Sequence, residues 1–264
     1  MLKGVIFDLD GVIVDSHPAH TRAWNKFLLS VGKSVTEAEL EFVRDGRKKE
    51  DILRHFLGDV DGREIHAYSH KKDAFFNEEV KGVNTVPGIG ELLNELNRAG
   101  VPAAVASSGS SERVNYILDL VGLRKYLAVV VTGDEVAKGK PDPAVFCKAA
   151  EKLRVAPSDS LAFEDSVSGV RAARAAGMKC LGIATPPRAR SLVEAGAQDV
   201  LVDFVGTSVS RIRQLFQQAC HTGHRIESAA TPSSLFDRAE VTVSVLAGID
   251  VCFRSFQWET NAID

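Results

Sequence analysis

The sequence predicts an α/β fold with a doubly wound parallel sheet, because six short apolar runs alternate with helical patterns along most of the chain. Runs that are apolar throughout are typical of strands covered on both faces. Strands that alternate with helices in this way are joined by right-handed crossovers. The predicted strands are Gly4–Phe7, Val101–Ala106, Ala128–Val131, Ser160–Phe163, Cys180–Ile183 and Asp199–Val202.

The helical segments between these strands begin and end at recognisable capping residues. Ser110 or Ser111 can cap the second helix, and Asp142 followed by Pro143 is typical of an N-cap and the first helical position of the third. Gly177 terminates the fourth helix. The predicted helices are Ile89–Arg98, Glu112–Val121, Pro143–Leu153 and Ser166–Ala176.

Residues 16–80 interrupt the alternation, since they contain only helical patterns separated by glycines. Thr36 to Glu39 has the spacing of a capping box. We therefore expect a Rossmann-like α/β core formed by residues 1–15 and 81–218, with a small α-helical cap domain, residues 16–80, inserted after the first strand. Residues 219–264 form a C-terminal extension of unknown role, with one strand-like run at Val241–Leu246.

Composition excludes several classes of protein. The 264 residues carry a formal net charge of −3 without a dense basic block, so nucleic acid is not expected as a partner. The four cysteines are far apart, which disfavours a zinc site and a disulfide framework. Asp8 and Asp10 interrupt the apolar N-terminus, and no run approaches the length of a membrane helix. We expect a cytoplasmic monomer that has no membrane partner.

Asp8 and Asp10 end the first strand and are followed by Gly11. Two carboxylates this close repel each other, which raises the pKa of one of them unless a cation lies between them. Mg²⁺ prefers such carboxylate ligands together with phosphate oxygens. The same residues are also common in a simple strand-to-loop turn, so this motif alone is weak evidence.

Four more side chains strengthen the interpretation. Ser107, Lys140, Glu164 and Asp165 all follow predicted strands, and the carboxyl ends of parallel strands meet at one edge of the sheet. Taken singly, Ser107 could be a turn residue or a helix cap, Lys140 a surface charge, and Glu164 with Asp165 a helix N-cap. Together with Asp8 they supply a nucleophile, a hydroxyl donor, a cation for phosphate and carboxylates for a metal. The set predicts a phosphoryl-transfer site.

These residues resemble the motifs of the haloacid dehalogenase-like (HAD) hydrolases, in order and spacing, over roughly residues 1–218. The helical insertion resembles the type-one cap of that superfamily. Within that superfamily, the chain resembles the β-phosphoglucomutase-like branch more closely. The residues that carry this resemblance are Asp8–Ile13, Asp15, Ser16, His20, Arg22–Trp24, Gly46, Glu50–Asp51 and Gly139–Pro141.

The resemblance implies a chemistry for each residue of the core. Asp8 attacks phosphorus and forms a covalent aspartyl-phosphate, while Asp10 protonates the leaving oxygen and then activates the next nucleophile. Ser107 and Lys140 neutralise the phosphoryl oxygens. The implied Mg²⁺ ligands are Asp8, the backbone carbonyl of Asp10, Asp165 and Glu164, the last as a supporting or direct ligand.

The resemblance also implies a substrate site for a small phosphorylated sugar or a related phosphate monoester. Its residues are Ser16, His20, Trp24, Gly46, Lys49, Lys71 and Ser108. Lys49 stands where the mutase has the arginine that binds the distal phosphate, and lysine lacks the bidentate fork of arginine. Ser16 replaces a hinge threonine, and residues 107–111 lack the lysine-asparagine pair of the mutase. Trp24 fits packing within the cap equally well.

Three functions remain open from the sequence. The chain is a sugar-phosphate phosphatase, or a β-phosphoglucomutase that isomerises β-glucose 1-phosphate and glucose 6-phosphate, or a noncatalytic binding protein on the same fold. The complete set of acidic and phosphate-binding residues disfavours the third. A dehalogenase is a further possibility on fold analogy, but Asp10 disfavours it because proton transfer to an alkoxide is needed in phosphotransferases.

Overall fold

A six-stranded parallel sheet forms the core of the protein in a computed structural model, which describes residues 1–218. The C-terminal extension expected from the sequence, including Val241–Leu246, lies outside these residues. The strand order is β3-β2-β1-β4-β5-β6, as predicted for a doubly wound fold. The strands are β1 (Gly4–Phe7), β2 (Ala103–Ala106), β3 (Val129–Val131), β4 (Ser160–Glu164), β5 (Lys179–Ile183) and β6 (Val200–Leu201).

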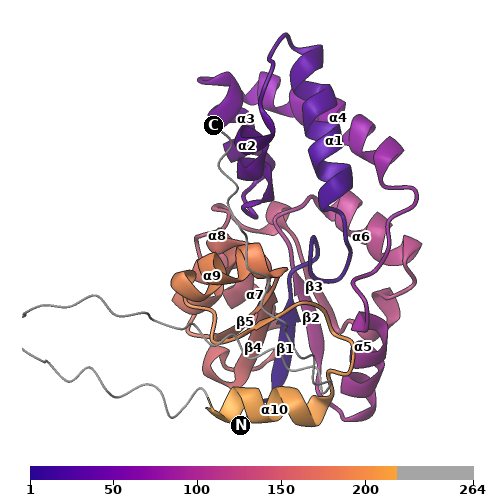
Figure 1. The fold of residues 1–264 in the computed structure, drawn as a ribbon, viewed down its shortest axis with the longest axis vertical. Coiled ribbons are helices and arrows are strands. Elements are labelled where there is room, and N and C mark those ends of the chain that lie inside the picture. The colour runs from indigo at the N-terminus through magenta and orange to yellow at the C-terminus, as the bar shows by residue number, and fades with distance from the viewer. Residues whose placement is uncertain (219–264) are drawn as a thin grey trace, which may run out of the picture. The chain divides into compact units, whose positions relative to one another are not determined.

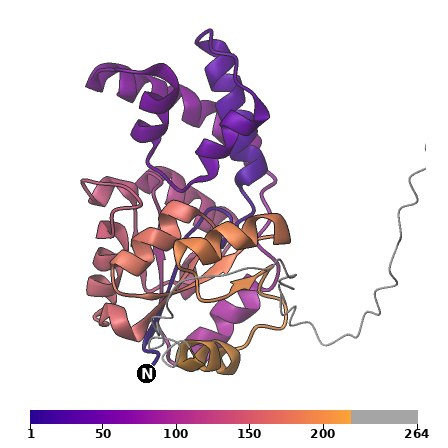
Figure 2. The same cartoon turned by 60° about the vertical axis from the view of Figure 1, so that its left-hand side comes forward.

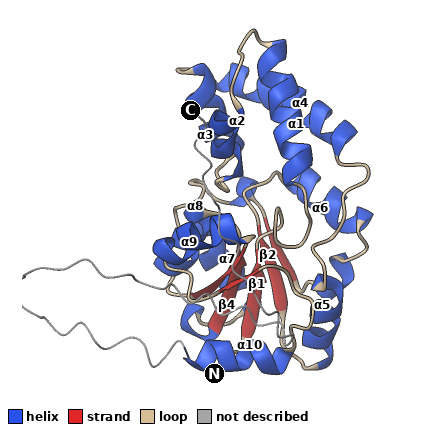
Figure 3. Ribbon diagram, viewed as in Figure 1, coloured by secondary structure: helices blue, strands red, loops and turns tan. Residues whose placement is uncertain are grey.

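Helices cover both faces of the sheet (Figures 1 and 3). Val5 and Phe7 belong to the apolar cluster that contains α5, α6 and α10, whereas Ile6 belongs to the cluster that contains α7, α8 and α9. Alternate residues of β1 thus face opposite layers, which is why the whole run is apolar. These helices are α5 (Ile89–Arg98), α6 (Ser111–Leu120), α7 (Ala144–Leu153), α8 (Val167–Ala175), α9 (Pro186–Ala195) and α10 (Val209–Gln218).

Several element ends differ from the sequence expectation. β2 begins at Ala103 rather than Val101, since Pro102 has no N–H to donate to a strand ladder. α7 begins at Ala144, with Pro143 at the N-cap position and Asp142 Oδ1 accepting from the Ala144 amide at 3.0 Å. Proline therefore precedes the helix here rather than occupying its first position. The helices α9 and α10 are additional to those predicted.

A group of helices from residues 17–79 lies beyond the carboxyl ends of the strands, and we call it the cap (Figure 2). Its apolar cluster is separate from those of the sheet and includes Trp24, Phe27, Leu53 and Phe56. The predicted capping box at Thr36 is present, with its hydroxyl accepting from the Glu39 amide. The cap helices are α1 (His17–Ser30), α2 (Glu37–Leu40), the 3₁₀ turn η1 (Glu41–Arg44), α3 (Lys49–Leu57) and α4 (Gly62–Glu79).

Short 3₁₀ turns complete the connections of the core. They are η2 (Arg124–Tyr126), η3 (Gly133–Glu135) and η4 (Pro157–Asp159). Among residues 1–218, no helix combines the length and apolar character needed to cross a membrane.

Phe204 anchors the segment between β6 and α10 to the sheet. Its ring, 1% exposed, meets the stacked rings of Phe7 and Phe163 edge-on, with centroid distances of 6.1 and 5.2 Å. Phe204→Ala should lower the free energy of unfolding by about 3–5 kcal/mol, because it leaves a cavity against two strands. Urea titration measures this change.

Val202→Ala is the matched control for Phe204→Ala. Val202 is 59% exposed and only two residues away, so its truncation should change the free energy of unfolding by about 0.5 kcal/mol or less. Equal losses in the two variants would contradict the proposed anchoring.

Candidate active site

Three carboxylates meet at the carboxyl edge of the sheet. Asp8 follows β1, Glu164 ends β4 and Asp165 follows it; all are buried, and one oxygen from each lies within 4.8 Å of the others. The register that pairs Phe7 with Phe163 places these residues side by side. Carboxylate oxygens are the donors that Mg²⁺ prefers, so this cluster fits a divalent cation.

Lys140 is the buried counter-charge of this cluster. Its ammonium donates to Asp8 Oδ1 at 2.6 Å and to Glu164 Oε1 at 2.5 Å. Burial alone would lower the pKa of Lys140, but the two carboxylates raise it above its ordinary value. Burial raises the pKa of Asp8 to about 8 despite the attraction of Lys140. A cation beside Asp8 would lower that pKa and favour the ionised, nucleophilic carboxylate.

Glu164 and Asp165 are held by further partners. Glu164 Oε2 accepts from the amides of Asp165 and Ser166, each at 3.0 Å, and from the Ser166 hydroxyl at 2.9 Å. Because Lys140 occupies its other oxygen, Glu164 fits the supporting role better than that of a direct ligand. Asp165 Oδ2 lies 2.5 Å from His17 Nε2.

The Asp165–His17 pair depends on Gly11, which has a φ of +76°. A Cβ at Gly11 would lie 2.3 Å from His17 Nε2 and 2.5 Å from Asp165 Oδ2. Burial would lower the pKa of His17, but Asp165 raises it above 6.5. Sequence reasoning missed His17, since a single histidine at the start of a helix carries no distinctive pattern.

Asp10 points away from the carboxylate cluster toward a group of hydrogen-bond donors. Arg113 donates to both of its oxygens, at 2.9 and 2.8 Å, and the Ser16 hydroxyl donates to Oδ1 at 2.6 Å. His20 Nε2 lies 3.2 Å from the same oxygen. Burial would raise the pKa of Asp10, but Arg113 and His20 hold it well below its usual range.

Arg113 is the functional residue that sequence reasoning missed most clearly. Only 9% exposed, it lies in the buried face of α6 and places its guanidinium 5.4 Å from the centre of the Phe76 ring. A Cβ at Gly109 would lie 2.1 Å from Arg113 Nη2, so any other residue there would displace the guanidinium. Its spacing could have identified it: Arg113 is four residues before Ile117, so the two share the apolar face of the helix, where a charged residue is unusual.

Lys72, rather than Lys71, faces the site. Lys71 is exposed and donates to the Ser30 carbonyl at 3.3 Å, so the structure does not bring it to the pocket. Lys72 is 1% exposed, lies over the rings of Trp24 and Phe76, and has its Nζ 3.2 Å from His20 Nδ1. Burial, with the nearby Arg113, lowers the pKa of Lys72 to about 7.

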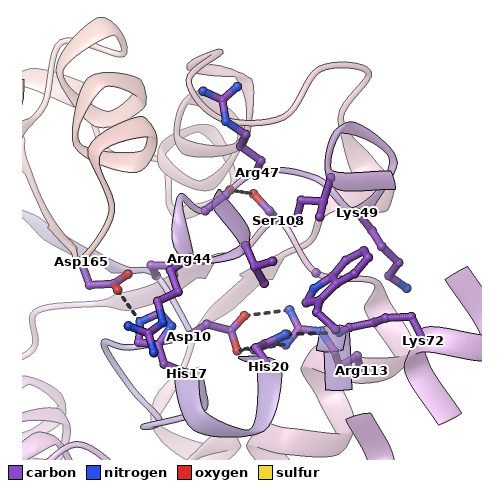
Figure 4. A pocket seen from close by; sticks show the side chains of 16 residues that line it. Asp10, His17, His20, Arg44, Arg47, Lys49, Lys72, Ser108, Arg113 and Asp165 are labelled. Carbon is purple, nitrogen blue, oxygen red and sulfur yellow. Dashed lines mark hydrogen bonds and ion pairs between the residues drawn. The ribbon is translucent and has the colours of Figure 1, made fainter. Parts of the chain in front are cut away.

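A small cavity of about 70 Å³ lies among these groups. Figure 4 shows the side chains that line it. Its core side is acidic, with Asp8, Asp10 and Asp165. Five basic side chains also line the cavity: Arg44, Arg47, Lys49 and Lys72 come from residues 41–79, and Arg113 comes from α6 of the core. This mixture of carboxylates and cations fits a phosphoryl group bound together with a metal ion.

Most residues predicted from the sequence line this cavity or contact its walls. Those that line it are Asp8, Asp10, His20, Trp24, Gly46, Lys49, Ser108 and Asp165. Lys140 and Ser16 lie behind it, bonded to Asp8 and Asp10. Ser107 is fully buried at the end of β2, where its hydroxyl accepts from the Gly109 amide at 3.1 Å.

One short segment, residues 45–48, fastens the cap to the core. Asp45 accepts from the Ser168 hydroxyl at 2.6 Å, and the Gly46 carbonyl accepts from Ser108 at the same distance. Lys48 donates to the Val136 carbonyl at 2.8 Å. These three hydrogen bonds tie the cap to the core beside the cavity.

Relatives of known name match the chain over most of its length. The family of haloacid dehalogenase-like hydrolases matches residues 2–177. Validoxylamine A 7'-phosphate phosphatase from Streptomyces hygroscopicus subsp. limoneus is 34% identical over 208 residues, covering 76% of this chain and 93% of the relative. Hexitol phosphatase A of Escherichia coli K12 is 34% identical over 184 residues, covering 70% and 84%. Beta-phosphoglucomutase of Bacillus subtilis 168 is 32% identical over 197 residues, covering 69% and 83%.

Solved structures show the same fold. CbbY from Rhodobacter sphaeroides, in complex with phosphate, has a TM-score of 0.70 at 27% identity and covers 81% of this chain and 100% of its own. Beta-phosphoglucomutase from Clostridium difficile has a TM-score of 0.74 at 22% identity, covering 83% and 99%.

The His20 ring should remain neutral in weakly acidic solution. Burial and the Lys72 ammonium lower the pKa of His20 from 6.5 to about 3. At about pH 5, ¹⁵N spectra should therefore show one protonated and one unprotonated ring nitrogen. Lys72→Met removes a positive charge and should raise the pKa of His20.

Lys71→Met is the control for Lys72→Met, because it removes the same charge one residue away on the exposed side of α4. It should leave the His20 spectrum unchanged. A doubly protonated His20 ring in the unaltered protein at about pH 5 would contradict the assignment.

Proposed function

We propose that this chain, which belongs to the haloacid dehalogenase-like hydrolases, is a phosphatase. The proposed enzyme depends on Mg²⁺ and acts on a small phosphorylated sugar. Enzymes named as sugar phosphatases and as phosphomutases both lie among its relatives, which supports a phosphorylated small molecule as the substrate. The observation that carries the proposal is Asp8, a buried carboxylate bonded to Lys140 and grouped with two further carboxylates.

In the first step Asp8 attacks the phosphorus of the bound ester. Lys140 holds Oδ1, and within residues 1–218 no hydrogen bond occupies Oδ2, which we assign as the attacking atom. Mg²⁺ would be held by Asp8 and Asp165, with the Asp10 carbonyl and Glu164 in support, and would neutralise charge on the phosphoryl oxygens. The leaving alkoxide takes a proton from Asp10.

Asp10 has to alternate between two protonation states during this cycle. Arg113 holds it ionised in the structure, which is the form that accepts a proton from the water attacking the aspartyl-phosphate. For the first step Asp10 has to carry a proton instead. The substrate therefore has to draw Arg113 away from Asp10, and Arg113 can then bind the phosphate ester.

Hydrolysis is favoured over mutase activity by the pairing of three of the four cap cations that line the cavity. A mutase has to hold a second phosphate at the cap, but Arg44, Arg47 and Lys49 each have a carboxylate partner already: Glu41, Asp45 and Asp73 respectively. A second phosphate would have to displace these carboxylates. β-Phosphoglucomutase activity remains the alternative, since the relative from Bacillus subtilis bears that name.

Incubation with β-glucose 1-phosphate and catalytic glucose 1,6-bisphosphate distinguishes the two. A phosphatase releases inorganic phosphate, whereas glucose 6-phosphate without free phosphate would establish the mutase and overturn the proposal. A noncatalytic protein would give neither product.

Asp8→Asn should lower kcat by about a thousandfold or more, because an amide cannot form the phosphoenzyme. Steady-state phosphate release measures the loss, and circular dichroism checks the fold. Asp119→Asn, an exposed aspartate on α6, makes the same chemical change away from the site and should retain full activity. Turnover by Asp8→Asn at a rate near that of Asp119→Asn would refute the assignment.

Gly109→Ala should lower kcat/KM by about tenfold to a hundredfold. The added Cβ would lie 2.1 Å from Arg113 Nη2 and would displace the guanidinium from Asp10. Phosphate release over a range of substrate concentrations provides the measurement. Gly90→Ala, in α5, is the control, since its Cβ would have only Leu123 Cδ2 nearby, at 3.8 Å. Similar activities of the two variants would show that catalysis does not require the Arg113 guanidinium to lie next to Asp10.

A further inference from the structure

A large groove lined by many polar side chains adjoins the small catalytic cavity. Its volume is about 820 Å³, against about 70 Å³ for the cavity that contains Asp8. The catalytic cavity therefore has less than a tenth of the volume of the groove. It can hold a phosphoryl group and few atoms beyond it. The remainder of any larger substrate has to lie elsewhere.

One wall of the groove is a stripe along the whole of α4. His66, Ser69, Asp73 and Asn77 recur every three or four residues and so share one face of the helix. An 18-residue helix is about 27 Å long, far longer than a single sugar ring requires. The opposite wall is formed by the start of α6, including Glu112 and Tyr116.

The groove and the catalytic cavity meet at three residues. Lys49, Ser108 and Arg113 line both spaces. Arg113 is also bonded to Asp10, the residue proposed to protonate the leaving oxygen. These three side chains lie between the two spaces, and the ester oxygen has to lie next to Asp10. Once the substrate has drawn Arg113 away from Asp10, the alcohol part of the substrate can leave the catalytic cavity here and continue into the groove.

The charges of the groove differ from those of the catalytic cavity. Its basic side chains are Lys48, Lys49, Lys81 and Arg113. Its carboxylates are Glu50, Asp73, Glu112 and Asp134, an equal number. A groove with balanced charge offers little net attraction to a second phosphate or to nucleic acid. Its charged groups, hydroxyls and imidazoles are instead donors and acceptors for an uncharged, polyhydroxylated ligand.

We propose that the enzyme hydrolyses the phosphate monoester of a neutral polyol about the size of a disaccharide, with the phosphate in the catalytic cavity and the polyol along α4. This inference rests on the proposed phosphatase function and specifies its substrate class. Ligand sites commonly have volumes of about 300–1,000 Å³, and this groove lies near the upper end. A single hexose would leave most of it to water.

A series of esters of increasing length tests the inference on the intact chain. Glycerol 3-phosphate, glucose 6-phosphate and trehalose 6-phosphate share a primary phosphate ester and differ in what it is attached to. The value of kcat/KM should rise along the series and be about tenfold higher for trehalose 6-phosphate than for glucose 6-phosphate, because contacts remote from phosphorus contribute to transition-state binding.

Tyr116→Ala removes a side chain from the wall of the groove without touching the catalytic cavity. It should lower kcat/KM by about fivefold to tenfold for trehalose 6-phosphate and by no more than about twofold for glucose 6-phosphate. Leu120→Ala is a matched control: Leu120 lies one turn further along α6 and is 45% exposed, against 44% for Tyr116, but does not line the groove. It should change neither value.

The outcomes separate this inference from the proposed function. Hydrolysis of the two smaller esters with no gain for trehalose 6-phosphate overturns the inference and leaves the phosphatase in place. An equal loss on all three esters in Tyr116→Ala also overturns it, since the residue would then act on the fold. No hydrolysis of any ester overturns both.

Discussion

The buried ion pair of Lys140 with Asp8 and Glu164 is the interaction on which the site depends. Three carboxylates lie within 4.8 Å of one another away from water, which is costly unless positive charge compensates them. One ammonium neutralises part of this charge, and Asp165 is satisfied by His17. The negative charge that remains is suited to a divalent cation. The repulsion between these carboxylates destabilises the fold, and for the same reason it favours binding of a metal ion.

A second charge pair links the chemistry to the cap. Arg113 comes from the core helix α6, bonds to Asp10, and lies against Phe76 of the cap. His20 of the cap contacts the same aspartate and Lys72. A substrate that alters the position of Arg113 therefore changes both the proton affinity of Asp10 and a contact between cap and core. Binding and proton transfer share one group of side chains.

The parallel sheet could be predicted from the sequence, because short and continuously apolar runs such as Gly4–Phe7 are typical of strands buried on both faces. The sequence was also sufficient to predict residues that lie at or a little beyond the carboxyl ends of strands. Asp8 and Asp165 directly follow β1 and β4, Lys140 lies nine residues after β3, and the structure brings all three together. Side chains supplied by helices were harder to predict. Whether Lys71 or Lys72 faces inward depends on the rotation of α4, and Arg113 reaches Asp10 only because Gly109 leaves room for it. Both depend on packing between elements distant in sequence.

The strand order also constrains how the protein is made. β1 leaves the ribosome before the other five strands of the sheet, yet it lies in the middle, where Gly4 pairs with Ser160 of β4. At translation rates of about 5–20 residues per second, this edge of β1 waits on the order of 10–30 s for its partner. During that time an apolar strand with unpaired backbone groups is open to association with other chains. Because Asp8 follows a central strand, β1 has to be covered before β4 is synthesised, either by a chaperone or by α5 and β2.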